Sequence, residues 1–213
     1  MLSAEIEAVL FNPPWTVPTS IVRREIQPLL RRDPGYLARN YFVFLGGKEG
    51  ASTGIDWRTT SILGNGWQLQ QKPGPWNSLG RIKLELPNPM DVYLHDTPLR
   101  ALFKKSVRAL SHGCISVDDI KYLAAMLLGE GWPVEAIDRE IAQGVTHRVA
   151  LEQKVPVYLV YLTAFVDTDG TVEFRNDVYG RDERLSVALA RKEAGQLVAE
   201  REVSRYTTGC PAG

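Results

Sequence analysis

The stretch Ser111-His112-Gly113-Cys114-Ile115-Ser116 joins a basic segment to an apolar pattern and decides how the surrounding chain is interpreted. Over residues 117–128 apolar residues recur at helical spacing, which predicts a helix. Ser116 is the candidate N-cap of that helix. Cys114 would then lie near unpaired backbone N–H groups and the positive end of the helix dipole. Both features favour a thiolate over a thiol.

Two interpretations of Cys114 are open at this level. As a nucleophile, it would be helped by the backbone N–H groups around Gly113, which are candidates for an oxyanion hole. Gly113 also permits a turn that most residues resist and lets a substrate approach closely. Alternatively, Cys114 is a small buried hydrophobic residue, as most free cysteines are.

A nucleophile needs a base, and the chain has only three histidines. Residues 91–97 alternate in polarity, which predicts a half-buried strand that presents Tyr93 and His95 on one face. His112 is only two residues from Cys114, which is short for a good hydrogen bond. His147 lies in another predicted strand, where a structural role is favoured.

His95, followed by Ser111-His112-Gly113-Cys114, resembles the signature of the L,D-transpeptidase catalytic domain, the YkuD family. Other matching segments point to the large branch of that family, which carries an inserted capping subdomain. They are residues 11–18, 71–80, 93–97 and 178–182. The resemblance spans about residues 4–190.

This resemblance implies roles for the residues that match the signature. Cys114 is the acyl-accepting nucleophile, and His95 is the general base. The backbone carbonyl of Asp96 orients the imidazole, Gly113 contributes to the oxyanion hole, and His112 supports the site.

Ser116 departs from the family pattern, which usually has Arg or sometimes Asn at this position. The missing cation affects substrate positioning more than thiol chemistry, and Arg108 is the best candidate to replace it. The expected substrate-binding residues are Tyr93, Trp76, Ser111, Ser116 and Arg108.

The resemblance also implies a reaction. The Cys114 thiolate attacks a peptidoglycan stem tetrapeptide, releases D-alanine and passes the acyl group to an amine, either of a second stem peptide or of a protein lysine. Carbapenem-type β-lactams are the expected covalent inhibitors, and neither a cofactor nor a metal is implied.

Two alternative functions remain open. One is a cysteine L,D-carboxypeptidase or amidase-type hydrolase, and the other is a degenerate wall-binding module. A zinc site of His95, His112 and Cys114 is a weaker idea, because a fourth ligand is missing.

Composition narrows the class of protein. The 213 residues include 25 Lys and Arg and 25 Asp and Glu, so no net charge argues for a nucleic-acid partner. No run of 18 or more apolar residues suggests a membrane span. The resemblance implies a periplasmic or cell-wall location, with the signal segment absent from this chain. Cys210, in a Gly- and Thr-rich tail, is expected to be a free thiol, since a disulfide with Cys114 would consume the nucleophile.

Many short predicted strands separated by Pro and Gly turns indicate a mainly β, α+β fold with sandwich-like mixed sheets rather than a parallel α/β sheet. We expect one catalytic domain over residues 1–213, with 19–66 as an inserted capping or lid subdomain and 203–213 as a flexible tail. Strands are expected near residues 4–11, 41–45, 67–71, 81–86, 91–97, 145–149, 155–166 and 171–174. Helices are expected near 19–30, 117–128, 133–144 and 183–201.

Overall fold

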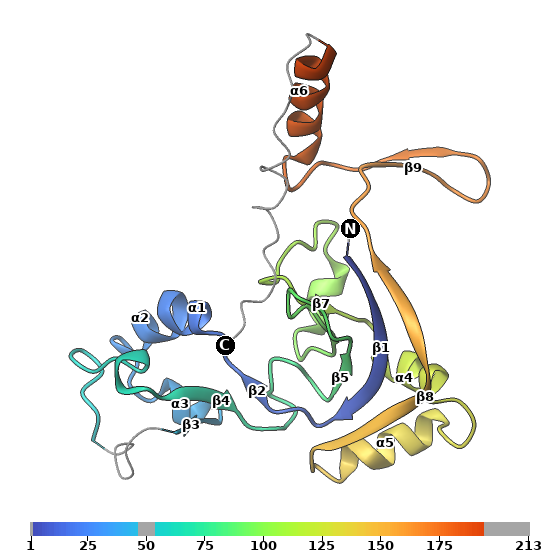
Figure 1. Ribbon diagram of the computed structural model, residues 1–213. Coiled ribbons are helices and arrows are strands. Elements are labelled where there is room, and N and C mark those ends of the chain that lie inside the picture. Colours follow the sequence, from blue (N-terminus) through green and yellow to red (C-terminus); the bar gives the residue numbers. More distant parts are fainter. Residues whose placement is uncertain (1, 47–53, 194–213) are drawn as a thin grey trace. The chain divides into compact units, whose positions relative to one another are not determined.

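The computed structural model describes residues 2–46 and 54–193, and these fall into two compact units (Figure 1). The larger unit comprises Ala4–Val157, and the smaller one begins at Tyr158 and includes the first residues of the chain. The predicted tail over 203–213 lies outside the described residues. Among the described helices, none combines the length and apolar character needed to cross a membrane.

A five-stranded mixed sheet forms the centre of the larger unit, in the order β7-β6-β5-β1-β8. Strand β5 is antiparallel to both β1 and β6, whereas β6 is parallel to β7. Strand β8 contains Pro156 and lies at the edge of the sheet, which is where proline is found in sheets. The strands are β1 (Leu2–Phe11), β5 (Ile82–Glu85), β6 (Leu94–His95), β7 (Ile115–Ser116) and β8 (His147–Leu159).

One face of this sheet packs against helices α4 (Ile120–Leu128) and α5 (Val134–Ala142). On β5 the buried residues Ile82 and Leu84 alternate with less buried ones, as expected when one face of a strand meets a core. On β1 the phase of the core residues changes between Ile6 and Val9, so the alternation is not continuous along that strand. The core comprises Ile6, Val9, Phe11, Ile82, Leu84, Leu86, Leu94, Ile120, Ala124, Ile137 and Leu151. The side chains that alternate with these residues therefore face the other side of the sheet.

A second hydrophobic core lies between β1 and β5 in the sequence. Its helical part runs without interruption from Thr19 to Leu30 as α1 (Thr19–Ile21), a π-helical segment η1 (Val22–Ile26) and α2 (Gln27–Leu30). Its sheet has the order β2-β4-β3. The remaining elements are β2 (Trp15–Thr16), α3 (Tyr36–Arg39), β3 (Phe42–Leu45), a short 3-10 helix η2 (Leu63–Asn65) and β4 (Gln68–Gln71). These elements include the described part of the predicted capping subdomain.

The smaller unit contains the predicted hairpin and terminal helix. Strands β9 (Ala164–Val166) and β10 (Val172–Phe174) pair in antiparallel fashion across residues 167–171. Helix α6 (Arg181–Glu193) follows. The expected single strand over 155–166 is wrong, because residues 160–163 interrupt it between β8 and β9.

The α+β class is confirmed, but a second local prediction is wrong. The helix predicted over 117–128 begins at Ile120, and Asp119 occupies the N-cap position with φ 48° and no side-chain capping bond. Ser116 belongs to β7 and is therefore not the N-cap. The backbone N–H of Val117 instead donates to the carbonyl of His95, so pairing with β6 competes successfully with helix formation.

Candidate active site

The sheet register places Cys114, the residue directly before β7, next to the strand that carries His95. Leu94 pairs with Ile115, and His95 pairs with Ser116. The N–H of Ile115 donates to the carbonyl of Tyr93 at 3.0 Å, which places Cys114 beside Tyr93. Because side chains alternate along a strand, Cys114 and Ser116 share the face of Tyr93 and His95, opposite to the core.

The His95 ring is buried and held in one orientation. Its Nδ1 lies 2.5 Å from the backbone carbonyl oxygen of Asp96, and the Tyr93 ring packs edge-on at 5.8 Å. A carbonyl can only accept, so Nδ1 carries the proton and Nε2 holds the free lone pair in the neutral ring. Burial lowers the pKa of His95 below its usual 6.5, although the Asp96 contacts partly oppose this shift. The neutral ring, which can act as a base, is therefore favoured near pH 7.

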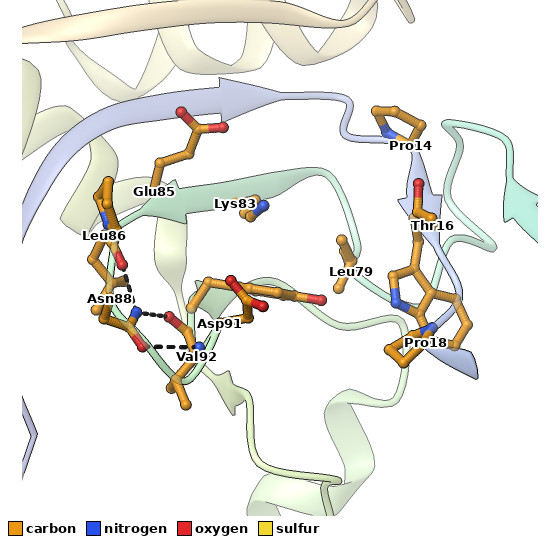
Figure 2. A pocket seen from close by; sticks show the side chains of 13 residues that line it. Pro14, Thr16, Pro18, Leu79, Lys83, Glu85, Leu86, Asn88, Asp91 and Val92 are labelled. Carbon is orange, nitrogen blue, oxygen red and sulfur yellow. Dashed lines mark hydrogen bonds between the residues drawn. The ribbon is translucent and has the colours of Figure 1, made fainter. Parts of the chain in front are cut away.

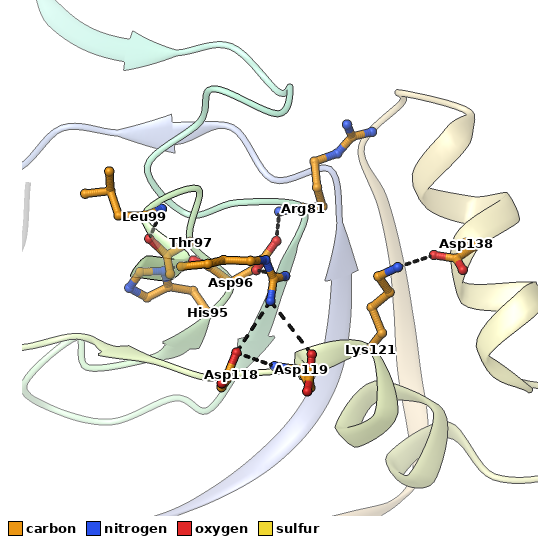
Figure 3. Close-up of polar contacts among 10 residues, drawn as sticks. Arg81, His95, Asp96, Thr97, Leu99, Asp118, Asp119, Lys121 and Asp138 are labelled. Carbon is orange, nitrogen blue, oxygen red and sulfur yellow. Dashed lines mark hydrogen bonds and ion pairs between the residues drawn. The ribbon is translucent and has the colours of Figure 1, made fainter. Parts of the chain in front are cut away.

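Asp96 is fixed in turn by a polar network on its carboxylate (Figure 3). One carboxylate oxygen accepts the backbone N–H of Arg81 at 2.8 Å, and the other lies 2.9 Å from Arg100 Nη2. Gly80 makes room for this carboxylate, since a Cβ at that position would lie 2.4 Å from the carboxyl carbon. The backbone that holds His95 is thus restrained at the next residue.

Arg81 extends the network to the end of α5. Its Nε donates to Asn12 Oδ1 at 2.8 Å, and its Nη2 donates to the carbonyl of Ile141 at 2.5 Å. The buried Asn12 amide donates to three backbone carbonyls, those of Glu140, Ile141 and Val145. These bonds join the end of β1, the start of β5 and the C-terminal end of α5, where carbonyls are less fully satisfied by the helix itself.

Cys114 is buried, and its Sγ lies 4.0 Å from the carbonyl oxygen of Asp91. The expected helix-dipole effect is weak here, because α4 begins only at Ile120 and the dipole acts mainly within the first turn. Cys114 is disulfide-bonded in this structure, so a nucleophilic role requires its reduction. The prediction that Cys210 is a free thiol lies outside the described residues.

A cavity of about 520 Å³ opens beside this face of the sheet (Figure 2). Neither Cys114 nor His95 lines it, but Tyr93 and Asp91 do, and both are neighbours of Cys114. Burial raises the pKa of Tyr93, and a side-chain hydrogen bond with Trp15 partly offsets the effect. The cavity is lined by Pro14, Trp15, Thr16, Pro18, Leu79, Lys83, Glu85, Leu86, Pro87, Asn88, Asp91, Val92 and Tyr93.

Of the five predicted substrate-binding residues only Tyr93 lines this cavity, and the other four, Trp76, Ser111, Ser116 and Arg108, do not. Trp76 stacks on Tyr41 with ring centroids 3.6 Å apart and does not line the cavity, whereas Trp15 does. Arg108 is exposed, and its Nη1 lies 3.5 Å from the carbonyl of Phe103 within the same segment, which forms the 3-10 helix η3 (Arg100–Lys104) and a following loop.

The loop before Cys114 is shaped by its own contacts. The N–H of Gly113 donates to Ser111 Oγ at 3.3 Å, so in this structure it is not directed at an oxyanion. The His112 Nε2 lies 2.6 Å from Glu25 Oε1, which belongs to η1. His112 thus connects the loop to the segment inserted between β1 and β5. Among the described residues, no three His, Cys, Asp or Glu side chains are grouped so that they could hold a metal ion.

Sequence reasoning missed the functional candidates Lys83 and Arg100. The alternation of residues 81–86 does place Lys83 on the face opposite the core, but only the register sets it beside His95. Arg100 lies in the basic segment before Cys114, and its guanidinium lies between Asp96 and the carboxylates of Asp118 and Asp119. No local pattern reveals either arrangement.

Chemically, this face combines a sulfur, an oriented neutral imidazole and a neighbouring cavity of suitable size for part of a peptide. Comparison with known proteins points in the same direction. The model of the YkuD family, the L,D-transpeptidase catalytic domain, matches residues 1–157. A Haemophilus influenzae protein that carries the provisional name L,D-transpeptidase is 30% identical over 191 residues, covering 88% of this chain. The chain spans 38% of that relative's length.

Proposed function

Because this chain belongs to the YkuD family of L,D-transpeptidase catalytic domains, we propose that it cross-links peptidoglycan through a thioester on Cys114. The observation that supports the proposal is the pairing of β6 with β7, because Cys114 directly precedes β7 and His95 is on β6. Since peptidoglycan is the substrate, the proposal also includes action outside the cytoplasmic membrane.

In the first half of the proposed reaction, His95 Nε2 takes the Cys114 proton. The thiolate then attacks the carbonyl that joins the L-centre of the diamino acid to D-alanine. The S–C bond forms, the C–N bond breaks, and the imidazolium returns its proton to the leaving amine of D-alanine. The hydrogen bond of Nδ1 to the Asp96 carbonyl supports this sequence, because it keeps Nε2 available for proton transfer.

In the second half, an acceptor amine attacks the thioester. Its nitrogen bonds to the acyl carbon and loses a proton to His95, while the S–C bond breaks and regenerates the thiolate. The acceptor is the amine of a second stem peptide or a protein lysine. Water in the same position would give hydrolysis instead.

The test is incubation of the reduced protein with a stem tetrapeptide, followed by mass spectrometry of protein and products. We expect released D-alanine, a transient acyl adduct on Cys114 and a cross-linked peptide dimer. Cys114→Ser is the control and should give none of these. A tripeptide without a dimer would favour the hydrolase, and no turnover would favour a wall-binding module. An adduct at any other residue would contradict the assignment of the nucleophile.

The same preparation tests the expected inhibitors. Carbapenem-type β-lactams should raise the intact mass by one drug equivalent in the reduced wild-type protein, because the strained amide places an acyl carbon where the donor carbonyl would be. Cys114→Ser should remain unmodified. Omission of the reductant should reduce labelling, since Cys114 is disulfide-bonded in the structure.

A further inference from the structure

Lys83 stands in one row with His95 and Ser116 across three adjacent strands. Lys83 on β5 pairs with His95 on β6, which pairs with Ser116 on β7. Paired residues of neighbouring strands point to the same face. Ser116 is neutral, so Lys83 is the cation of this row.

The Lys83 ammonium lacks a strong partner among the described residues. Among the described residues, Nζ contacts the Tyr93 ring, whose centroid lies 4.4 Å away. No described carboxylate oxygen lies within 4.0 Å of Nζ, the distance that defines an ion pair. The nearby Glu85 carboxylate is engaged by Arg148 at 2.7 Å, and Asp91 is exposed. A partly buried cation without a counterion is costly, which favours an anionic ligand beside it.

The position of Lys83 also suits such a ligand. It lines the 520 Å³ cavity, where Figure 2 shows it between Glu85 and Leu79. The two arginines near His95, unlike Lys83, have polar partners: Arg81 binds Asn12, and Arg100 binds Asp96. Strands in a sheet lie about 4.8 Å apart, so Lys83 stands one strand away from His95, within reach of a peptide bound over it.

We propose that Lys83 binds a carboxylate of the donor peptide and so positions the scissile carbonyl at Cys114. This inference rests on the proposed function and identifies a substrate-binding residue for it. The donor has two candidate carboxylates, that of the terminal D-alanine and that on the side chain of the diamino acid. Both offer the same chemistry to an ammonium group.

The experiment compares Lys83→Met, which removes the charge at similar length, with Lys83→Arg, which retains it. Lys72→Met makes the same chemical change at an exposed position and is the matched control. On the tetrapeptide donor, Lys83→Met should lose about 10- to 100-fold in kcat/KM, the usual effect of losing a charge-assisted hydrogen bond. Lys83→Arg should recover part of the loss, and Lys72→Met should match the wild type. The melting temperature of Lys83→Met should not fall, because the removed charge has no ion-pair partner.

Two modified donors identify the carboxylate. One carries a C-terminal D-alanine carboxamide, and the other has lysine in place of the diamino acid and so lacks the side-chain carboxylate. The donor without the recognised group should react equally with the wild type and Lys83→Met. The inference is overturned if kcat/KM of Lys83→Met on the full donor stays within about twofold of the wild-type value. It is also overturned if kcat/KM of Lys83→Met still falls, relative to its value on the full donor, with each of the two modified donors.

A binding measurement separates failure of this inference from failure of the proposed function. Calorimetry of the full tetrapeptide is carried out in the Cys114→Ala background with and without Lys83→Met. We expect the Lys83 change to weaken binding about tenfold or more. If the wild type releases no D-alanine but binding still depends on Lys83, the reaction is wrong and the carboxylate site stands. If binding is unchanged, the site is wrong.

Discussion

At the residue scale, His95 and His112 have different surroundings although both belong to the family signature. His95 is buried, and its Nδ1 is bound to a backbone carbonyl. His112 is exposed, and its Nε2 contacts Glu25 of η1. A fixed ring on the same strand face as Cys114 is suited to proton transfer. A ring that contacts an inserted segment is suited to holding a loop.

This difference predicts unequal effects of alanine substitution. His95→Ala should slow acylation of Cys114 by about 10²- to 10⁴-fold, the usual cost of losing a general base. His112→Ala should slow it by less than about tenfold, because exposed ion pairs contribute roughly 0–1 kcal/mol. Stopped-flow measurement of D-alanine release checks both variants, and the opposite order of severity would assign the base to His112.

The pKa of His95 predicts a pH profile. Burial lowers this pKa below 6.5, and only the neutral ring accepts a proton. The acylation rate should therefore rise with pH through a value below 6.5 and be independent of this group above it. Measuring acylation from about pH 4 to pH 8 checks the position of the acid limb. An acid limb clearly above 6.5 would show that a different group, or an imidazole stabilised in its charged form, controls the reaction.

At the scale of elements, the short strand β6 is held by a paired strand on each side and by the contacts of the residue that follows it. It pairs with β5 on one side and β7 on the other. Asp96, directly after it, is bound by Arg81 and Arg100. Two residues of strand alone would hold a catalytic side chain loosely, so this polar network substitutes for strand length.

Gly80 provides a test of that support. Its φ of +62° disfavours any side chain, and a Cβ would lie 2.4 Å from the Asp96 carboxyl carbon. Gly80→Ala should therefore lower the free energy of unfolding by about 2–5 kcal/mol, as backbone strain and overpacking add. It should also slow acylation, because Asp96 must move. Urea unfolding monitored by tryptophan fluorescence measures the first effect.

Gly66→Ala is the matched control for this substitution. Gly66 has a similar φ of +69°, and nothing lies within 4 Å of its added Cβ. It should cost only about 1–2 kcal/mol, the strain of a left-handed backbone alone. Equal losses in the two variants would mean that the contact between Gly80 and Asp96 is unimportant.

At the scale of the whole molecule, the site depends on the larger unit alone. All the described contacts of His95, Asp96 and the cavity lie within Ala4–Val157. The main core also ends there, with Val155 and Val157 as its last contributors. The family model matches the same part of the chain, residues 1–157.

A chain truncated after Val160 should consequently fold and react. It keeps all of β8, and we expect a cooperative thermal transition and acylation of Cys114 at a rate close to that of the full chain. Calorimetry and intact-mass labelling provide the measurements. Loss of the transition would show that residues beyond 160 stabilise the larger unit.

The sequence by itself determined the features that depend on local spacing. The strands expected near 4–11, 81–86 and 171–174 correspond to β1, β5 and β10, and the helix expected near 133–144 corresponds to α5. The motif around Cys114, together with His95, identified the family. These features are readable because the residues that cause them are neighbours in the chain.

Only the tertiary structure decided how distant residues meet. Ser116 is a strand residue rather than a helix cap because β6 offers it pairing partners. Lys83 is a candidate ligand-binding residue because β5 places it beside His95 and a cavity forms there. The contacts of Asn12 with residues 140–145 and of Glu25 with His112 likewise span most of the larger unit. Such contacts follow from strand register and packing, which the pattern of a single segment does not specify.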